Sequence, residues 1–420
     1  MTSARSIRRD EVNRSIPIYV VWETTLRCDH ACAHCGSRAG AYTREDELDT
    51  KELLEVADAL VRLGSREVTL IGGEAYLRGD VYELIQHMAK GGIRVTMQTG
   101  GRGLTPTRAQ KLKDAGLAAI GVSVDGTEEV HDTLRAAPGS HAAALEAIRN
   151  ARAAGMIVTS NSQINRLNMH VLRETAELLE QAGVLVWRAQ LTAPMGRAAD
   201  HPEWIIQPYM ILDIIDTLAE IQAEAKARAE AKGVSEMRSF RVTLGNNVGY
   251  YGPHEAKLRS RPDRQNRFFG GCQAGRYVMG IESDGTIKGC PSLPTGPYDG
   301  GNVRNLDLEQ IWNGSEIIGF TRERGVEELW GHCATCYYAE VCKAGCSFTA
   351  HSTLGRRGNF PFCYYRAMKL KREGKREILL PAERAPGNPY DFGRFALSEE
   401  AWSEEPPELP KRRSLPVLGT

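Results

Sequence analysis

The chain has no long apolar run, no surplus of charge of either sign and no cysteine between residues 36 and 271. A helix that spans a membrane needs about 20 consecutive apolar residues, and no run in the chain approaches that length. The first 15 residues carry several charges without an apolar stretch behind them, unlike a secretion signal. Lys plus Arg and Asp plus Glu both number 53, so no overall field attracts nucleic acid. We therefore expect a cytoplasmic protein with no membrane and no nucleic-acid partner.

The ten cysteines stand in two groups that lie far apart in the sequence. Three fall within residues 28–35 and seven within residues 272–363. Reducing conditions in the cytoplasm keep thiols free for metals or catalysis, which argues against a disulfide framework. Cysteines of an ordinary core would be scattered along the chain, so the grouping predicts two separate metal-binding segments.

A repeated pattern of short strands and amphipathic helices fills residues 17–187. β-branched runs predict strands, and stretches of helical period predict helices. The expected strands are 18–24, 67–71, 94–99, 119–124, 158–164 and 186–191, and the expected helices are 50–63, 81–90, 106–115, 140–154 and 171–181. Six such units in succession predict a parallel sheet, either a barrel or an open doubly wound sheet.

The first cysteine group, Cys28, Cys32 and Cys35, has the spacing C-x3-C-x2-C and follows the first predicted strand. Three thiolates on one cubane cluster leave one iron free for chemistry. The spacing resembles the signature of the radical S-adenosylmethionine (SAM) superfamily, in which the free iron binds SAM and passes it an electron. The resemblance implies a partial (β/α)6 TIM-like barrel and a 5'-deoxyadenosyl radical as product. From the residues alone, the three cysteines could instead hold zinc, with His30 or His34 as fourth ligand.

Residues at the ends of later strands extend the resemblance. A Gly-Gly-Glu run after the second predicted strand stands where radical SAM enzymes bind the SAM amino group. The region after the fourth strand resembles the peptide-modifying branch, in which a serine and an arginine hold the SAM carboxylate. The resemblance assigns SAM contacts to Gly72, Gly73, Glu74, Ser123, Arg135, Gln190 and Leu191. Ser123 also suits a turn or a helix N-cap, and Gln190 also suits a buried contact with backbone.

The second cysteine group matches the seven-cysteine SPASM pattern at every interval. Its members are Cys272, Cys290, Cys333, Cys336, Cys342, Cys346 and Cys363. SPASM is the auxiliary-cluster domain of radical SAM enzymes that mature peptides, so the resemblance implies two further 4Fe-4S clusters and three in all. It assigns Cys333, Cys336, Cys342 and Cys363 to one cluster, and Cys272, Cys290 and Cys346 to the other. The three-cysteine cluster then has a position for water, substrate or a residue such as His254. The four cysteines from Cys333 to Cys346 also suit a zinc ribbon.

At 420 residues the chain exceeds the usual size of one hydrophobic core, so several parts are expected. They are an N-terminal arm (1–15), a radical SAM partial barrel (16–235), a bridging segment (236–271), a strand-poor SPASM domain (272–365), and a basic helix followed by a tail (366–420). From about Pro381 the tail is rich in proline and charge, a composition that predicts disorder.

The SPASM resemblance implies a radical SAM oxidoreductase that acts on a ribosomally synthesised precursor peptide, with crosslinking as the favoured outcome and oxidation as another. It also implies a separate leader-peptide-recognition protein, because the residues before the first strand are too few for a leader-binding domain, and an electron donor such as flavodoxin or ferredoxin. A small-molecule SPASM dehydrogenase and a non-catalytic iron-sulfur or zinc protein are the alternatives. Asp125, Tyr250 and Tyr251 are candidates for a catalytic acid or base.

Overall fold

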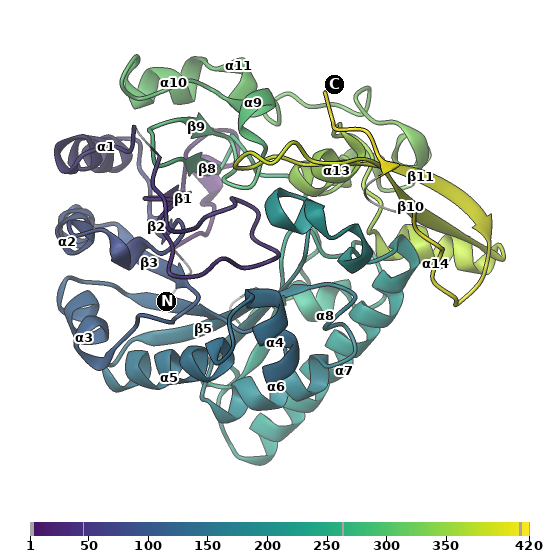
Figure 1. Ribbon diagram of the computed structural model, residues 1–420, viewed down its shortest axis with the longest axis horizontal. Coiled ribbons are helices and arrows are strands. Elements are labelled where there is room, and N and C mark those ends of the chain that lie inside the picture. Colours follow the sequence, from purple (N-terminus) through teal and green to yellow (C-terminus); the bar gives the residue numbers. More distant parts are fainter. Residues whose placement is uncertain (1–3, 45, 263, 411–413, 420) are drawn as a thin grey trace.

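A nine-stranded sheet forms the centre of the protein (Figure 1). The computed structural model describes residues 4–44, 46–262, 264–410 and 414–419. The strand order is β7-β6-β5-β4-β3-β2-β1-β8-β9, so the first six strands follow one another in space as they do in sequence. That order, with every neighbouring pair from β1 to β6 parallel, is the expected partial barrel.

The barrel strands and helices alternate as the sequence predicts. The strands are β1 (Tyr19–Glu23), β2 (Glu67–Ile71), β3 (Arg94–Thr99), β4 (Ala119–Ser123), β5 (Ile157–Ile164) and β6 (Val186–Leu191). The helices are α1 (Thr50–Arg62), α2 (Val81–Lys90), α3 (Pro106–Asp114), α4 (Glu128–Arg135), α5 (Ser140–Ala153) and α6 (Leu172–Gln181). The short helix α4 was not predicted, and it carries Arg135 at its end.

Local chemistry explains where the helices begin. At the start of α1, Asp49 accepts a hydrogen bond from the Glu52 backbone, and Glu52 accepts one from the Asp49 backbone. This capping box satisfies two amide groups that a helix start leaves free. Leu53, Val56 and Leu60 then repeat on one buried face of α1, which packs against the sheet.

Side chains alternate between the two faces of the barrel strands. Along β6, Trp187 and Leu191 are buried, whereas Arg188 and Gln190, which alternate with buried positions, are half-buried. The half-buried positions point away from the helix layer, because successive strand residues face opposite sides. Asn161 of β5 stands next to Arg188 in the register. The inner face of the barrel is therefore polar and keeps some accessible surface.

The sheet continues beyond the barrel on both sides. The long helix α7 (Ile211–Ala231) leads to β7 (Arg241–Leu244), which pairs in parallel with β6. On the other side, β8 (Val278–Ile281) pairs in parallel with β1, and β9 (Ile287–Lys288) returns antiparallel to β8. The cysteine-rich segment, which was expected to be strand-poor, thus begins by extending the barrel sheet.

Short helices build the rest of the cysteine-rich segment around this edge. They are α8 (Glu255–Arg259) before it, then α9 (Thr295–Tyr298), α10 (Leu308–Gly314), α11 (Glu316–Gly319), α12 (Ala339–Cys342), α13 (Ser347–Leu354) and α14 (Tyr364–Arg372). Lys369, Lys371 and Arg372 lie in the last turn of α14, so the predicted basic helix is confirmed.

The prediction of disorder from about Pro381 is wrong for residues 381–383 and 394–401, which belong to a hairpin. β10 (Lys375–Glu383) and β11 (Arg394–Ala401) form an antiparallel hairpin, visible at the right of Figure 1. Leu379 and Phe395 bury their side chains in the main core. Charges in the segment that suggested disorder pair across the hairpin, as in Arg394 with Glu383, so they support the two strands rather than keep them apart.

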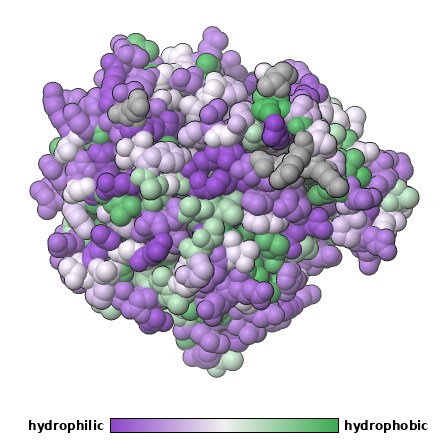
Figure 2. All heavy atoms as spheres, in the orientation of Figure 1, coloured by the Kyte–Doolittle hydropathy of each residue, from purple (hydrophilic) through white to green (hydrophobic). Residues whose placement is uncertain are grey.

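The surface in Figure 2 is mostly hydrophilic on the visible face, with small and scattered hydrophobic areas. Within the described ranges, none of the helices combines the length and the apolar character that crossing a bilayer requires.

Candidate functional site

The loop after β1 brings the first three cysteines to one end of the barrel. Its two ends are held together, because Cys28 donates to Gly40 O at 2.6 Å and Gly40 donates to Leu26 O at 3.1 Å. Burial raises the pKa of the Cys28 and Cys32 thiols, and the neighbouring thiol adds to the rise in each case. Thiols that crowd together in a buried loop need a cation to ionise, and bound iron supplies that charge. The donor set therefore fits a cluster.

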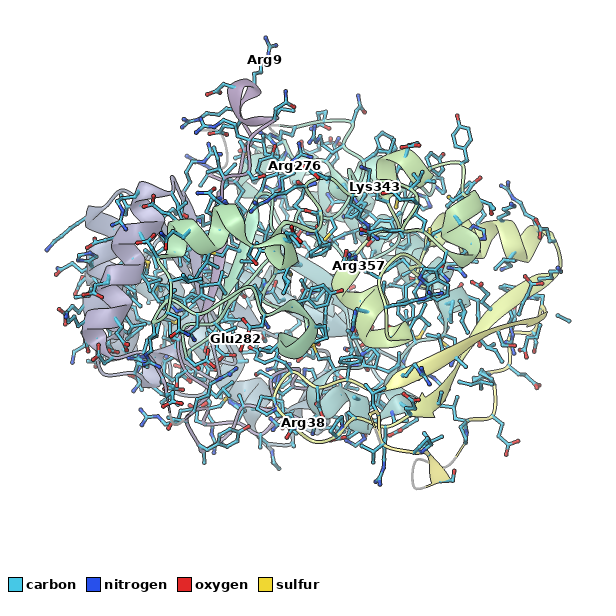
Figure 3. All side chains as sticks on the ribbon, turned by 90° about the horizontal axis from the view of Figure 1, so that it is seen from above. Arg9, Arg38, Arg276, Glu282, Lys343 and Arg357 are labelled. Carbon is cyan, nitrogen blue, oxygen red and sulfur yellow. The ribbon has the colours of Figure 1, made fainter. Side chains whose placement is uncertain are left out.

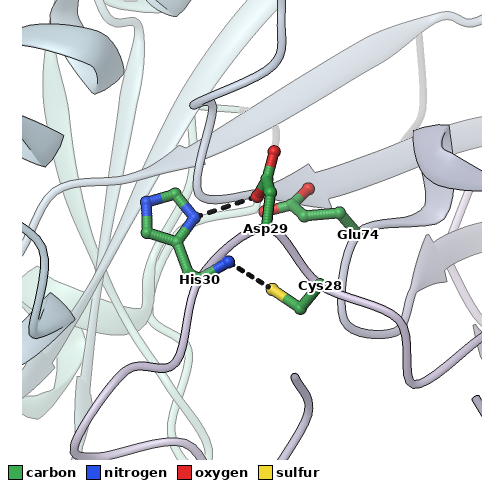
Figure 4. Close-up of side chains that lie close together, drawn as sticks. All are labelled: Cys28, Asp29, His30 and Glu74. Atoms are coloured by element: carbon green, nitrogen blue, oxygen red, sulfur yellow. Dashed lines mark hydrogen bonds and ion pairs between the residues drawn. The ribbon is translucent and has the colours of Figure 1, made fainter. Parts of the chain in front are cut away.

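Glu74 lies beside this loop in Figure 4, together with Cys28, Asp29 and His30. One ligand atom from each of the four residues falls within 4.8 Å of the others. Glu74 accepts hydrogen bonds from Thr99 Oγ1 at 2.5 Å and from the Gly100 backbone at 2.6 Å. Burial nevertheless raises the pKa of Glu74 to about 8. A buried carboxylate of this kind favours a cationic partner such as the SAM ammonium group.

The two glycines before Glu74 allow its loop to touch the cysteine loop. Gly73 donates to Thr25 O at 2.7 Å and Glu74 donates to Arg27 O at 2.8 Å. A Cβ atom on Gly73 would lie 2.3 Å from Arg27 O and 2.7 Å from Cys28 Cβ. The predicted Gly-Gly-Glu run therefore stands next to the cysteine loop, and its second glycine is required by close packing.

The histidines that would complete a zinc site have other contacts. His34 Nδ1 lies 2.9 Å from Leu134 O, and its Nε2 lies 3.5 Å from Asp125 Oδ2. His30 Nδ1 lies 3.1 Å from Asp29 Oδ1. Both nitrogens of His34 are thus engaged away from the thiols, which speaks against His34 as a zinc ligand.

Arg135 reaches the cysteine loop, but its charge is already paired. It donates to Asp125 Oδ2 from Nε at 2.9 Å and from Nη2 at 2.6 Å, while Nη1 lies 3.7 Å from Cys32 Sγ. The Arg135 guanidinium holds the pKa of the buried Asp125 carboxyl below its usual range, although burial alone would raise it. Nη1 is thus the one nitrogen of this guanidinium that makes no bond to Asp125, so the role implied by the resemblance is narrower than expected.

The same contacts argue against Asp125 as a catalytic acid or base. Its side chain is 1% exposed and also accepts from the Gln163 backbone at 2.9 Å. A carboxylate that is buried, paired and bonded in this way stays ionised and fixed. We interpret Asp125 as a residue that positions Arg135. Ser123 stands half-buried at the carboxyl end of β4.

The end of β6 contacts a turn that follows β7. Asn247 accepts from the Leu191 backbone at 3.2 Å and donates to Leu191 O at 2.8 Å. Gln190 faces the barrel interior beside Gln163 of β5. Gln190 and Leu191 thus lie at the strand end where SAM contacts were predicted. Asn247 was not predicted as a site residue, because a turn asparagine carries no signal of a distant partner.

Four of the later cysteines line one pocket. Cys333, Cys336, Cys342 and Cys363 surround it together with Tyr250, and about 370 Å³ of space within it is free of protein atoms. A pocket walled by four thiols fits a cluster ligated by cysteine alone. The structure thus brings together the four cysteines that the resemblance assigns to one cluster.

The remaining three cysteines form a second group. Burial raises the pKa of the Cys346 thiol, and the nearby Cys272 and Cys290 thiols add to the rise. Cys272 and Cys290 pack against the small apolar cluster around Tyr298. His254, the suggested fourth ligand, has its Nε2 atom 3.4 Å from Asp216 Oδ1 of α7 instead.

Arg324 is a cation beside the three-cysteine group that the sequence did not indicate. Its side chain is 2% exposed, and its Nη1 donates to Ser347 Oγ at 3.0 Å. Burial lowers the pKa of Arg324, and Cys272 opposes that effect. Ser347 follows Cys346 directly in the chain, so Arg324 is held next to the ligand set.

Two family descriptions match the chain in the places that the geometry indicates. The radical SAM superfamily matches residues 22–182, and the iron-sulfur cluster-binding domain SPASM matches residues 272–337. The chain contains a radical SAM domain and a SPASM domain. These two domain matches support SAM and iron-sulfur clusters as cofactors of the chain.

Proteins of two activities resemble this chain over most of its length. An AdoMet-dependent heme synthase of Nitratidesulfovibrio vulgaris is 28% identical over 355 residues, 84% of this chain and 93% of that protein. The mycofactocin maturase MftC of Mycolicibacterium smegmatis is 29% identical over 353 residues, 82% of this chain and 83% of that protein. Streptococcus suis SuiB bound to precursor peptide SuiA shares the fold with a TM-score of 0.60 and 13% identity, covering 83% of this chain and 75% of that chain.

Tyr250 and Tyr251 pack around the four-cysteine pocket of the SPASM domain. The Tyr250 hydroxyl donates to Asn246 O and accepts from the Cys346 backbone at 3.0 Å. The Tyr251 hydroxyl donates to Phe269 O. Both hydroxyl groups thus satisfy buried backbone atoms, so the expectation of an acid or base role gives way to a structural one.

Replacing Tyr250 with phenylalanine tests this interpretation. Losing its two backbone contacts should lower the free energy of unfolding by roughly 1–3 kcal/mol, whereas 5'-deoxyadenosine formation by protein that has folded should change less than twofold. Urea unfolding and a deoxyadenosine assay measure the two effects, with Tyr337→Phe as a control because Tyr337 is 84% exposed. A large loss of turnover at unchanged stability would restore Tyr250 as a catalytic candidate.

Replacing Glu74 with glutamine tests the proposed contact with the SAM amino group. The variant keeps the shape, and its amide oxygen can still accept from the Gly100 backbone, but its NH2 group cannot accept from Thr99 Oγ1 and the negative charge is removed. A charge-assisted hydrogen bond contributes about 1.5–3 kcal/mol, so the Kd for SAM should rise roughly 10- to 100-fold. Equilibrium binding of SAM to the reconstituted protein measures it, and an unchanged Kd would contradict the assignment.

Proposed function

We propose that this radical SAM enzyme removes a hydrogen atom from a ribosomally synthesised precursor peptide and oxidises the peptide. The observation that carries the proposal is that one sheet connects the loop of the first three cysteines with the segment of the seven later cysteines. The SAM-cluster loop follows β1, and the SPASM strand β8 pairs directly with β1. An oxidative reaction requires that the substrate radical lose an electron, and the SPASM cysteine sites offer a place for it.

The cofactors supply the reactive step and the chain positions it. When bound, the first cluster reduces SAM to methionine and a 5'-deoxyadenosyl radical, which abstracts hydrogen from an unactivated carbon. We assign Glu74 to the SAM ammonium group, and Arg135 Nη1, which lies beside Cys32 Sγ, to the SAM carboxylate. The polar inner face with Asn161 and Arg188 offers hydrogen bonds to the substrate end that enters the barrel.

Two resemblances support a peptide as substrate. MftC is named a mycofactocin maturase, and SuiB was crystallised with its precursor peptide. We further propose a separate leader-recognition protein and an electron donor such as flavodoxin or ferredoxin as partners, and crosslinking as the modification.

The relatives named heme synthases favour a second candidate, a carboxylate-bearing iron porphyrin. The similarity to the Nitratidesulfovibrio vulgaris protein covers 93% of that protein, more than the coverage of MftC. Arg188, placed on the polar inner face of β6, suits an anionic substrate group of this kind.

Anaerobic reconstitution with iron and sulfide, reduction with dithionite and addition of SAM test both candidates. Peptides encoded beside the gene and a carboxylate-bearing iron porphyrin are offered in parallel, and deoxyadenosine and substrate mass are followed. A peptide mass change in step with deoxyadenosine, absent in Cys32→Ala, supports the proposal. A change in the porphyrin alone would replace the peptide by the second candidate. Absence of deoxyadenosine from the fully loaded protein would overturn the radical reaction itself.

A further inference from the structure

The connection between β10 and β11 leaves the hairpin and reaches the radical SAM domain. We name these residues, 384–393, the strap. In Figure 1 the yellow strap runs from the hairpin toward β8 and β9. A short turn would suffice to join two antiparallel strands, so the length of the strap calls for another explanation.

The strap makes a bidentate ion pair with the SAM-cluster loop. Asp391 accepts from Arg38 Nε at 2.8 Å and from Nη2 at 3.2 Å. Arg38 stands three residues after Cys35, and its backbone has a left-handed φ of 54°. On its other side Arg38 donates to Asp200 at 2.7 and 3.1 Å. The Arg38 and Asp391 side chains are only 11% and 5% exposed, so little water screens their pair.

The strap also contacts the loop after β6, and that loop in turn donates hydrogen bonds to the backbone of the cysteine loop. Gly196 donates to Asp391 O at 2.7 Å. A Cβ atom on Gly196 would lie 2.4 Å from Cys35 O, so the two loops touch through their backbones. The next residue, Arg197, donates from its backbone to Cys35 O at 2.9 Å and from Nε to Cys32 O at 2.6 Å. Asp391 therefore reaches the ligand loop both through Arg38 and through this second loop.

A third contact ties the strap to the junction of the two domains. Tyr390 is 8% exposed, and its hydroxyl donates to Glu23 at the carboxyl end of β1. Lys288 Nζ of β9 lies 4.2 Å from the centre of the Tyr390 ring. Within the strap, Asp391 Oδ2 also accepts from the Gly387 backbone at 2.5 Å, which fixes the carboxylate toward Arg38. Figure 3 shows Arg38 beside the C-terminal chain, where it meets Asp391.

We propose that the strap is part of the SAM-cluster site, and that Asp391 is a positioning residue which holds Arg38 and the Cys28–Cys35 loop in the shape that retains iron. The alternative is that the strap supports the fold as a whole without any particular effect on this cluster. The two explanations differ in whether the SAM-binding cluster loses its iron before the SPASM clusters do. Loosening the loop exposes the SAM-binding cluster, while the SPASM cysteine sites keep their own contacts.

Four variants of the full chain provide the test. Asp391→Asn removes the charge at constant size, and Asp391→Ala removes the carboxylate. Replacing residues 384–393 with Asn-Gly closes the hairpin by a tight turn and deletes the strap. Glu399→Gln is the control, because Glu399 pairs with Lys375 on the exposed part of the same hairpin.

Each reconstituted, dithionite-reduced protein is exposed to an iron chelator and followed by electron paramagnetic resonance with and without SAM. The signal that changes with SAM reports the SAM-binding cluster. It should decay about tenfold faster in Asp391→Ala and in the strap deletion, with Asp391→Asn between these and wild type, since one buried charge-assisted contact is lost. The SAM-insensitive signal should decay at the wild-type rate in all variants.

Two results would overturn the proposal. One is decay of the SAM-sensitive signal at the wild-type rate in both Asp391 variants. The other is equal acceleration of both signals, which would mean that the strap serves the whole fold. If Asp391→Ala does not fold, the Asn variant, which keeps the size and part of the hydrogen bonding, decides the question. The outcome does not depend on the substrate, so it stands or falls separately from the proposed peptide reaction.

Discussion

Replacing Gly73 with alanine is expected to lower SAM-dependent 5'-deoxyadenosine formation about 100-fold, because a displacement near 1 Å at a reacting centre can cost that much. The added Cβ would lie 2.3 Å from Arg27 O and 2.7 Å from Cys28 Cβ, and both atoms belong to the cysteine loop. Neither is the end of a flexible side chain, so the loop itself must move. Glu74 would move with it, since it follows directly and donates to Arg27 O.

Gly79→Ala is the matched control for this prediction. Gly79 lies on the same connection after β2 and is exposed, and a Cβ atom added there would meet no other atom within 4 Å. Its substitution should leave deoxyadenosine formation within about twofold of wild type, as is usual for surface changes. Iron content and the initial rate with saturating SAM measure both variants. Equal activity of Gly73→Ala and Gly79→Ala would show that contact between the two loops is unimportant.

The barrel could be predicted from the sequence because its signals are local. Each of the six strands begins and ends within one residue of the expected position. Their buried β-branched runs alternate with amphipathic helices, and both patterns are contained in short windows. The cysteine groups are equally local, since the spacing of Cys28, Cys32 and Cys35 is readable in one loop.

The parts that could not be predicted depend on contacts between distant residues. β8 joins β1 across more than half of the chain, and no short window shows that pairing. The segment from about Pro381 looks disordered by composition, yet Arg394 and Glu383 meet only once the hairpin forms. Arg135 was expected to bind the SAM carboxylate, but two of its guanidinium nitrogens donate hydrogen bonds to Asp125. Sequence indicates which residues carry charge, and the fold decides with which groups they pair.

The pairing of Asp125 with Arg135 leads to the second large expected effect. Asp125→Ala should lower the free energy of unfolding by about 3–5 kcal/mol, because it leaves a buried guanidinium without its partner. Arg135 is 11% and Asp125 1% exposed, so water cannot replace the lost carboxylate. Urea unfolding of the cluster-free protein measures the change without any contribution from iron.

A double substitution separates the cost of an unpaired charge from the loss of the interaction itself. Arg135→Met with Asp125→Ala removes both charges, and replacing a buried pair by apolar groups is often neutral. The double variant should therefore be more stable than Asp125→Ala alone, even though it has lost more polar contacts. It should still fail to bind SAM normally, since Arg135 Nη1 is absent beside Cys32. If Asp125→Ala and the double variant unfold with the same free energy, the orphaned Arg135 charge is not the cause. The lost bond to the Gln163 backbone would then account for the instability.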